Sequence, residues 1–82
     1  MHCVYILKSL KTKEKFYIGL TNNLERRLKE HSDPSKDQYT HRYQPWQLET
    51  YVTFQNQLTA KKFESYLKTS SGRTFLKRHF LT

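Results

Sequence analysis

The sequence predicts a mixed α/β fold of the α+β type, with a three-stranded, mostly antiparallel sheet flanked by helices in the order β-β-α-β-α-α. Three observations carry this prediction: a pair of aromatic, strand-like runs joined by a short polar loop, a capped amphipathic helix after them, and a later alternating run followed by two helical patterns. Packing helices on one small sheet is the economical way to bury these faces. The 82 residues predict a single domain, 1–82.

The first two strands are predicted at residues 2–8 and 15–20, and the short polar loop between them favours an antiparallel hairpin. Side chains alternate between the faces of a strand, and opposite residues of an antiparallel pair share a constant sum of positions. An even sum places the odd-numbered residues of both strands on one face. That face carries Tyr5, Tyr17 and Gly19, and we expect it to form a cleft in which the missing side chain of Gly19 makes room for an approaching group. The other face is apolar and suits a core.

A helix is predicted directly after the hairpin, in "TNNLERRLKEH". Asn22 or Asn23 can cap its N-terminus. Leu24 and Leu28 form the buried pair at i and i+4, and the Asp33–Pro34 pair ends the helix. Arg27 and His31 therefore flank the apolar stripe, whereas Arg26, Lys29 and Glu30 point more towards water.

The second half of the chain contains a polar loop at 32–44, a strand at 46–54, a helix at 58–68 and, after the breaker "TSSG", a terminal helix at 73–80. The strand alternates apolar and polar residues from Trp46 to Phe54. Helical spacing points these side chains towards the core: Leu58, Phe63, Tyr66, Leu67, Phe75, Leu76 and Phe80.

Positive charge dominates the composition, since 15 Lys and Arg face 7 Asp and Glu, giving a net charge of +8. Such an excess favours a polyanionic partner, so we prefer nucleic acid to a merely soluble basic protein. A membrane surface is not expected, because no long amphipathic helix with a basic face is present. Tyr39, His41 and Arg42 in the polar loop, together with Arg26, are the candidate nucleic-acid-binding residues; a partly packed loop is the alternative.

Cysteine and histidine do not support a metal cluster. Cys3 is the lone cysteine, and the four histidines lack metal-ligand spacing. Glu64 has two interpretations: a surface ion pair with Lys68 at i+4, or a carboxylate that binds one Mg²⁺ through oxygen. The residues alone favour the surface pair.

Four segments together resemble the GIY-YIG nuclease superfamily. They are "VYIL" at 4–7, "YIG" at 17–19, "NNLERRLKEH" at 22–31 and "FESYLKTSSGR" at 63–73. The last segment is similar to the C-terminal part of small stand-alone members, which are related to the N-terminal nuclease domain of bacterial excision-repair endonucleases. The resemblance spans nearly the whole chain.

The resemblance implies a metal-dependent endonuclease that hydrolyses DNA phosphodiester bonds to give 5′-phosphate and 3′-hydroxyl ends, with a role in DNA repair or processing. It implies that Tyr5, Tyr17, Arg27 and Glu64 are catalytic and that Glu64 binds Mg²⁺ or Mn²⁺. Arg27 would contact two phosphate oxygens, and either tyrosine would act as the general base.

Supporting positions also match the family. Gly19 is the motif glycine, Asn23 caps the joint, and His31 stands where this helix often carries histidine. Two positions depart from the family pattern: the first motif lacks its glycine, and Leu20 replaces a lysine of the excision-repair members. The second departure predicts the loss of one cationic contact to phosphate.

Three functions therefore remain to be separated: a nuclease, a non-catalytic nucleic-acid-binding module that keeps the nuclease fold, and a protein-interaction domain. The expected partners are DNA, with RNA as an alternative, and a targeting protein, because the sequence contains no second DNA-binding domain. A cytoplasmic location is expected, since no signal peptide or apolar run of membrane length is present.

Overall fold

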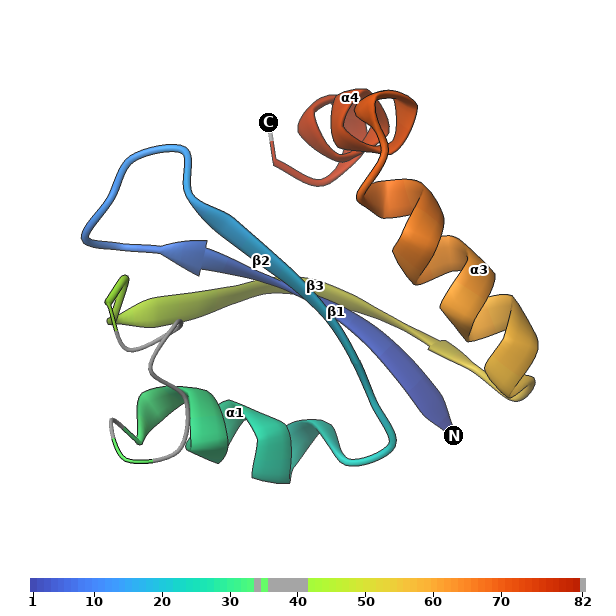
Figure 1. Ribbon diagram of the computed structural model, residues 1–82, viewed down its shortest axis with the longest axis horizontal. Coiled ribbons are helices and arrows are strands. Elements are labelled where there is room, and N and C mark those ends of the chain that lie inside the picture. The colour runs from blue at the N-terminus through green and yellow to red at the C-terminus, as the bar shows by residue number, and fades with distance from the viewer. Residues whose placement is uncertain (34, 36–41, 82) are drawn as a thin grey trace.

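The computed structural model describes residues 1–33, 35 and 42–81. These residues form the elements β1 (His2–Ser9), β2 (Phe16–Thr21), α1 (Leu24–Ser32), β3 (Trp46–Phe54), α3 (Gln57–Leu67) and α4 (Ser70–His79). The strands build a three-stranded antiparallel sheet in the order β2-β1-β3. Helix α1 covers one face of the sheet, and α3 with α4 covers the other (Figure 1). The predicted fold class and element order are confirmed.

The register of the β1–β2 hairpin is the even-sum case that was considered from the sequence. Cys3 pairs with Thr21 and Tyr5 with Gly19, so the position sum is even. The odd-numbered side chains of both strands consequently share the face under α1, and the even-numbered ones share the face under α3 and α4. A slip of one residue would exchange the two faces, so this register determines which side chains meet α1.

The face under α1 is a second core, and the expectation of an open cleft there was wrong. Cys3, Tyr5 and Leu7 are 5%, 0% and 1% exposed. Leu24 and Leu28 of α1 pack against them. The apolar stripe of α1 needs a surface to cover, and the odd-numbered residues of β1 provide it.

The larger core lies on the opposite face. Its buried members are Val4 and Ile6 from β1, Ala60 and Leu67 from α3, and Leu76 from α4. Ile18 and Leu20 of β2, together with the aromatic residues of the C-terminal half, pack around it. No helix within the described ranges combines the length and the apolar character that crossing a membrane would require.

Helix α3 buries a narrower face than the sequence predicts. Ala60 and Leu67 are fully buried, and Phe63 packs beside them. Leu58 and Tyr66, expected in the core, are instead 61% and 42% exposed. The spacing of Ala60, Phe63 and Leu67 follows one stripe of the helix, and Leu58 and Tyr66 lie off that stripe.

Helix α4 begins at Ser70 rather than at residue 73, because "TSSG" starts this helix instead of separating the two. Thr69 is the N-cap, and its side chain accepts a hydrogen bond from the backbone N–H of Gly72 at 3.1 Å. A Cβ at Gly72 would lie 1.8 Å from the carbonyl oxygen of Tyr66. The glycine therefore permits the close approach of α4 to the end of α3.

Candidate active site

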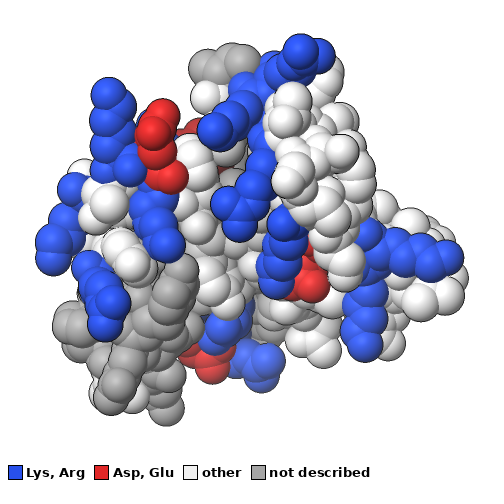
Figure 2. Space-filling view, turned by 45° about the horizontal axis from the view of Figure 1, so that its top comes forward, with Lys and Arg blue, Asp and Glu red and all other residues white. Residues whose placement is uncertain are grey.

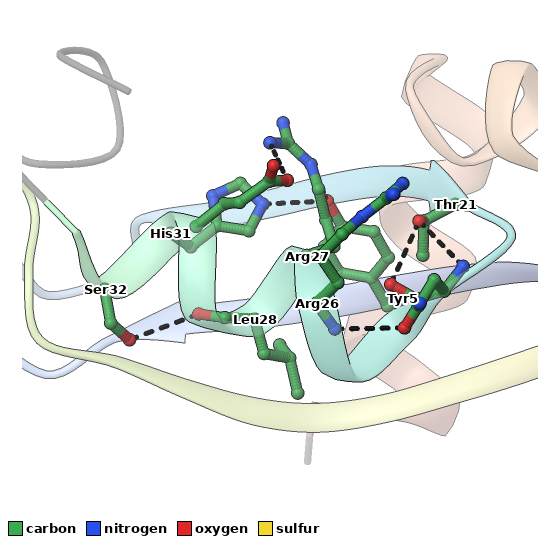
Figure 3. A network of polar contacts seen from close by, with 9 residues as sticks. Tyr5, Thr21, Arg26, Arg27, Leu28, His31 and Ser32 are labelled. Atoms are coloured by element: carbon green, nitrogen blue, oxygen red, sulfur yellow. Dashed lines mark hydrogen bonds and ion pairs between the residues drawn. The ribbon is translucent and has the colours of Figure 1, made fainter. Parts of the chain in front are cut away.

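The hydroxyl of Tyr5 is the meeting point of two side chains from α1. The Nε of Arg27 donates a hydrogen bond to this hydroxyl at 3.2 Å, and the Nε2 of His31 lies 2.8 Å from it. Arg27 and His31 are four residues apart, so both project from the same face of the helix onto one point of β1 (Figure 3). Tyr5 is 0% exposed and His31 is 1% exposed, so this part of the site is buried.

Gly19 makes this arrangement possible. It lies opposite Tyr5 in the hairpin, and a Cβ added to it would lie 2.4 Å from both Cζ and the hydroxyl oxygen of Tyr5. The missing side chain thus makes room for the ring of Tyr5 itself and not for an incoming group, which corrects the expectation from the sequence. With this space available, the phenol of Tyr5 lies flat across β2 and reaches α1.

Tyr17 completes a cluster of four side chains, called here the Tyr5 cluster (Tyr5, Tyr17, Arg27 and His31). The Tyr17 ring lies 6.2 Å from the Tyr5 ring and 4.7 Å from the His31 ring, measured between centroids. Tyr17 also forms a side-chain hydrogen bond with Arg27. In contrast to Tyr5 it is only half-buried, so it belongs to the part of the cluster that solvent can reach.

Arg27 connects the buried and exposed parts of the cluster. Burial acts to lower the pKa of its guanidinium, but electrostatic attraction to the Tyr5 oxygen and the hydrogen bonds that Arg27 donates to Tyr5, Tyr17 and Glu30 raise that pKa above its ordinary value. The group therefore stays cationic at neutral pH. Its Nη1 lies 3.2 Å from the Glu30 carboxylate, and the two side chains are 30% and 36% exposed.

Asn23 is the N-cap of α1, whereas the sequence allows either Asn22 or Asn23 in this role. Its side-chain oxygen accepts a hydrogen bond from the backbone N–H of Arg26 at 3.0 Å. The hydroxyl of Thr21, at the end of β2, accepts from the backbone N–H of Asn23 at 3.1 Å. These bonds fix the turn between strand and helix and so position the helix that carries Arg27 and His31.

Glu64 comes from a different helix than Arg27 and His31. It belongs to α3, which packs on the other face of the sheet, and its carboxylate lies 3.5 Å from the Nζ of Lys68. Its side chain is nevertheless only 21% exposed. Within the described ranges, no hydrogen bond or ion pair joins Glu64 to Tyr5, Tyr17 or Arg27. The structure thus brings together three of the four predicted catalytic residues, with the supporting His31 and Gly19.

Known families confirm the resemblance that these residues suggest. The GIY-YIG catalytic domain family matches residues 1–78. The chain belongs to this family. The UPF0213 protein CPE1444 of Clostridium perfringens (strain 13 / Type A) is 40% identical to this GIY-YIG domain over 68 residues, which are 83% of the chain and 71% of the relative. No solved structure matches the chain significantly.

Family membership supports the nuclease class of hydrolases for this GIY-YIG domain. Nucleases of this family are generally dependent on a divalent metal, and Glu64 is the carboxylate that the sequence predicts as its ligand. Among the described residues, no group of three or more His, Cys, Asp and Glu side chains converges. A single carboxylate still fits Mg²⁺, because this ion commonly keeps several waters and takes one or two protein carboxylates. Lys68 would have to yield its place beside the carboxylate.

The predicted nucleic-acid-binding residues fall into two groups. Arg26 and Arg42 are exposed, on α1 and in the turn before β3. Tyr39 and His41 lie outside the described residues. The ring of the neighbouring Tyr43 packs against Trp46 with centroids 6.2 Å apart, so this part of the loop is partly packed.

Sequence reasoning missed Glu30 as a partner of Arg27, because the residue was expected to point towards water. The signal was present: the two residues are three positions apart on one helix, where opposite charges are neighbours. The Glu30 carboxylate marks the exposed side of the guanidinium as a place where an anionic oxygen can bind.

Proposed function

We propose that this GIY-YIG domain is a metal-dependent endonuclease that hydrolyses DNA phosphodiester bonds, leaves 5′-phosphate and 3′-hydroxyl ends, and acts in DNA repair or processing. The observation that carries the proposal is the Tyr5 cluster, in which a permanently charged, partly exposed guanidinium is held beside two phenols. A phosphodiester needs such a cation where negative charge builds on its oxygens. DNA is the expected substrate, RNA is the alternative, and the cytoplasmic location and targeting protein stay predictions.

In the proposed mechanism the two tyrosines have different roles. Tyr5 is completely buried, and its hydroxyl is engaged by Arg27 and His31, so we assign it the role of positioning Arg27. Tyr17 is half-buried and contacts Arg27, so we assign it the role of general base. The phenolate form of Tyr17 takes a proton from a water, the water oxygen bonds to phosphorus, and the bond from phosphorus to the 3′ oxygen breaks.

Arg27 and Glu64 stabilise the other end of the reaction. The guanidinium of Arg27 contacts the phosphate oxygens in the place that Glu30 occupies beside it. Glu64 would hold the divalent metal, which supplies Lewis-acid stabilisation of the leaving oxygen when bound. The 3′ oxygen then takes a proton from solvent.

Cleavage of labelled DNA tests this proposal. Wild-type protein and the variants Arg27→Ala, Tyr17→Phe and Glu64→Gln are incubated with duplex, single-stranded and branched DNA in Mg²⁺, Mn²⁺ or EDTA. We expect metal-dependent cleavage that falls by at least ~10²-fold in Arg27→Ala, because one preorganised donor to the transition state is worth that much. Lys29→Ala and Glu25→Gln, which change exposed charges on the same helix, are the matched controls.

Two outcomes would contradict the proposal: wild-type protein that leaves every substrate intact, or variants that cleave as fast as wild type.

The roles assigned to the two tyrosines are tested by comparing the stability and the cleavage activity of their phenylalanine variants. Tyr5→Phe should lower the free energy of unfolding by ~1–3 kcal/mol, because it leaves buried partners unsatisfied. Tyr17→Phe should leave stability nearly unchanged while abolishing cleavage, and the reverse pattern would exchange the two roles.

One observation favours a second function, a nucleic-acid-binding module without catalysis. Glu64 is paired with Lys68 at 3.5 Å and, within the described residues, forms no hydrogen bond or ion pair with the Tyr5 cluster. This function predicts binding that needs no metal and is unaffected by Glu64→Gln, together with no cleavage by wild type under any metal. Loss of cleavage in Glu64→Gln alone would reject it.

A further inference from the structure

A positively charged groove lies on the face of the molecule opposite α1. It runs between the β1–β2 hairpin and α4 and consists of two adjoining pockets of about 270 and 340 Å³. Figure 2 shows Lys and Arg side chains gathered over the hairpin and over the C-terminal helices, with uncharged surface between the two groups. The residues that define this basic groove are Lys8, Lys13, Lys15, Phe16, Arg73 and Lys77.

We propose that the basic groove binds the phosphate backbone of a single strand of nucleic acid that extends from the active site. The inference deepens the proposed nuclease function by naming a substrate class: nucleic acid with a single-stranded segment next to the bond that is cut. The binding itself does not require catalysis, so it can be tested separately.

The charges of the groove are largely uncompensated within the described part of the chain. Lys8, Lys13, Arg73 and Lys77 form no ion pair there. Glu14 is the acid among the lining residues, and Lys15 lies over the ring of Tyr43 at 4.6 Å. Like charges that converge on one groove repel each other, and a chain of phosphates would relieve this repulsion.

The groove is preformed by the packing of its two walls. In the hairpin wall, the buried hydroxyl of Ser9 accepts hydrogen bonds from the backbone N–H groups of Lys11 and Thr12 at 3.2 and 3.0 Å. The same hydroxyl donates to the carbonyl oxygen of Tyr43 at 2.6 Å. In the other wall, Arg73 and Lys77 are four residues apart on α4 and so present their charges on one side of the helix.

The shape and chemistry of the groove favour a single strand over a duplex. Its cations line both walls of a concave channel, whereas a duplex is read by an element that protrudes into a groove ~12 Å wide. Phe16 adds an aromatic ring to the channel, and base stacking on aromatic rings is worth ~1–3 kcal/mol per base in single-strand binding.

The position of β2 links the groove to the Tyr5 cluster. β2 is one of the two edge strands of the described sheet, and its successive side chains point to opposite faces. Phe16 and Ile18 line the groove, while Tyr17, between them, belongs to the Tyr5 cluster. A flexible strand that passes over this edge would reach both sites, which a stiff duplex cannot do.

Fluorescence anisotropy in EDTA tests the proposal without cleavage. The probe is a labelled oligothymidine, compared with an oligouridine and with a duplex of equal length. The double variant Arg73→Glu/Lys77→Glu should weaken binding of both single strands at least tenfold and reduce the salt slope by roughly 1.4, since each lost phosphate contact on a single strand removes about 0.7. The matched control Lys61→Glu/Lys62→Glu makes the same charge change on exposed positions of α3 and should change the affinity less than twofold.

A second groove variant, Lys8→Glu/Lys13→Glu on the hairpin, should show the same loss of single-strand affinity. Because it leaves α4 unchanged, misfolding of α4 cannot explain a loss seen in both variants. Equal losses in the groove and control variants, or tighter binding of the duplex than of single strands, would overturn the proposal. Binding through the groove without any cleavage would reject the proposed nuclease function but support the groove as a binding site. Cleavage that both groove variants leave unchanged would support the nuclease function and reject the groove as its substrate-binding site.

Discussion

At the scale of single residues, the contact between Gly19 and Tyr5 determines the geometry of the candidate active site. The ring of Tyr5 occupies the space where Gly19 has no side chain, and its hydroxyl then reaches Arg27 and His31. A motif glycine is often interpreted as space for a substrate. In this protein the space is already filled, and the glycine acts on the site through the position of a buried phenol.

Substituting Gly19 by Ala tests this dependence. The new methyl group would lie 2.4 Å from the Tyr5 ring, and the completely buried ring has little room to move. We expect a loss of ~1–3 kcal/mol in the free energy of unfolding, measured by urea denaturation, because overpacking forces side chains and backbone to shift. The same substitution in a Tyr5→Leu background should be much less harmful, and an equal loss in both backgrounds would contradict the proposed contact.

At the scale of the elements, α1 is the part of the fold that builds the active site. Its inner stripe closes the second core, and the residues beside that stripe deliver Arg27 and His31 to Tyr5. The start of the helix therefore determines the angle at which both side chains arrive. Asn23 and Thr21 define that start through two backbone hydrogen bonds.

Alanine substitutions at Asn22 and Asn23 distinguish the residue that caps α1 from its neighbour. Asn23→Ala should lower the free energy of unfolding by ~0.5–2 kcal/mol, the usual effect of losing an N-cap, and should slow cleavage because the helix that carries Arg27 loses its fixed start. Asn22→Ala, one residue away and exposed, should change stability by less than about 0.5 kcal/mol. Thermal and urea unfolding measure both values, and equal effects of the two variants would count against the observed cap.

At the scale of the whole molecule, charge and topology act together. The domain carries a net charge of +8 at a radius of gyration of only 12.5 Å. The two proposed contact regions, the Tyr5 cluster and the basic groove, lie on opposite faces of the sheet beside the edge strand β2. The general positive field attracts nucleic acid of any sequence. Specific positioning then depends on the groove and on the Tyr5 cluster.

This field predicts strong salt dependence of binding. The logarithm of the affinity should fall with the logarithm of salt concentration by about 0.9 per phosphate contact on duplex DNA and about 0.7 on single strands, because binding releases condensed counterions. Anisotropy titrations in EDTA over a series of KCl concentrations measure the slope. Glu64→Gln should leave the slope unchanged, and a flat response would argue against nucleic acid as the partner.

Three features follow from the pattern of amino acids: the element order, the antiparallel hairpin and, for an even register, the face shared by Tyr5, Tyr17 and Gly19. These are local or periodic properties: alternation in strands, helical spacing and capping residues all lie within a few positions of one another. Family motifs then identified Tyr5, Tyr17 and Arg27 as neighbours. The resemblance could not reveal that Gly19 accommodates Tyr5, because that contact depends on the depth of one ring across two strands.

The burial of each group, and the element that covers it, depend on how the helices pack on the sheet. The tertiary structure closed the face of Tyr5 under α1, gave Arg27 its bond to Glu30, kept Glu64 beside Lys68, and placed α4 across from the hairpin to form the basic groove. These outcomes follow from the packing of helices on opposite faces of the sheet. Such packing joins residues far apart in the chain, and the order of amino acids alone does not give those distances.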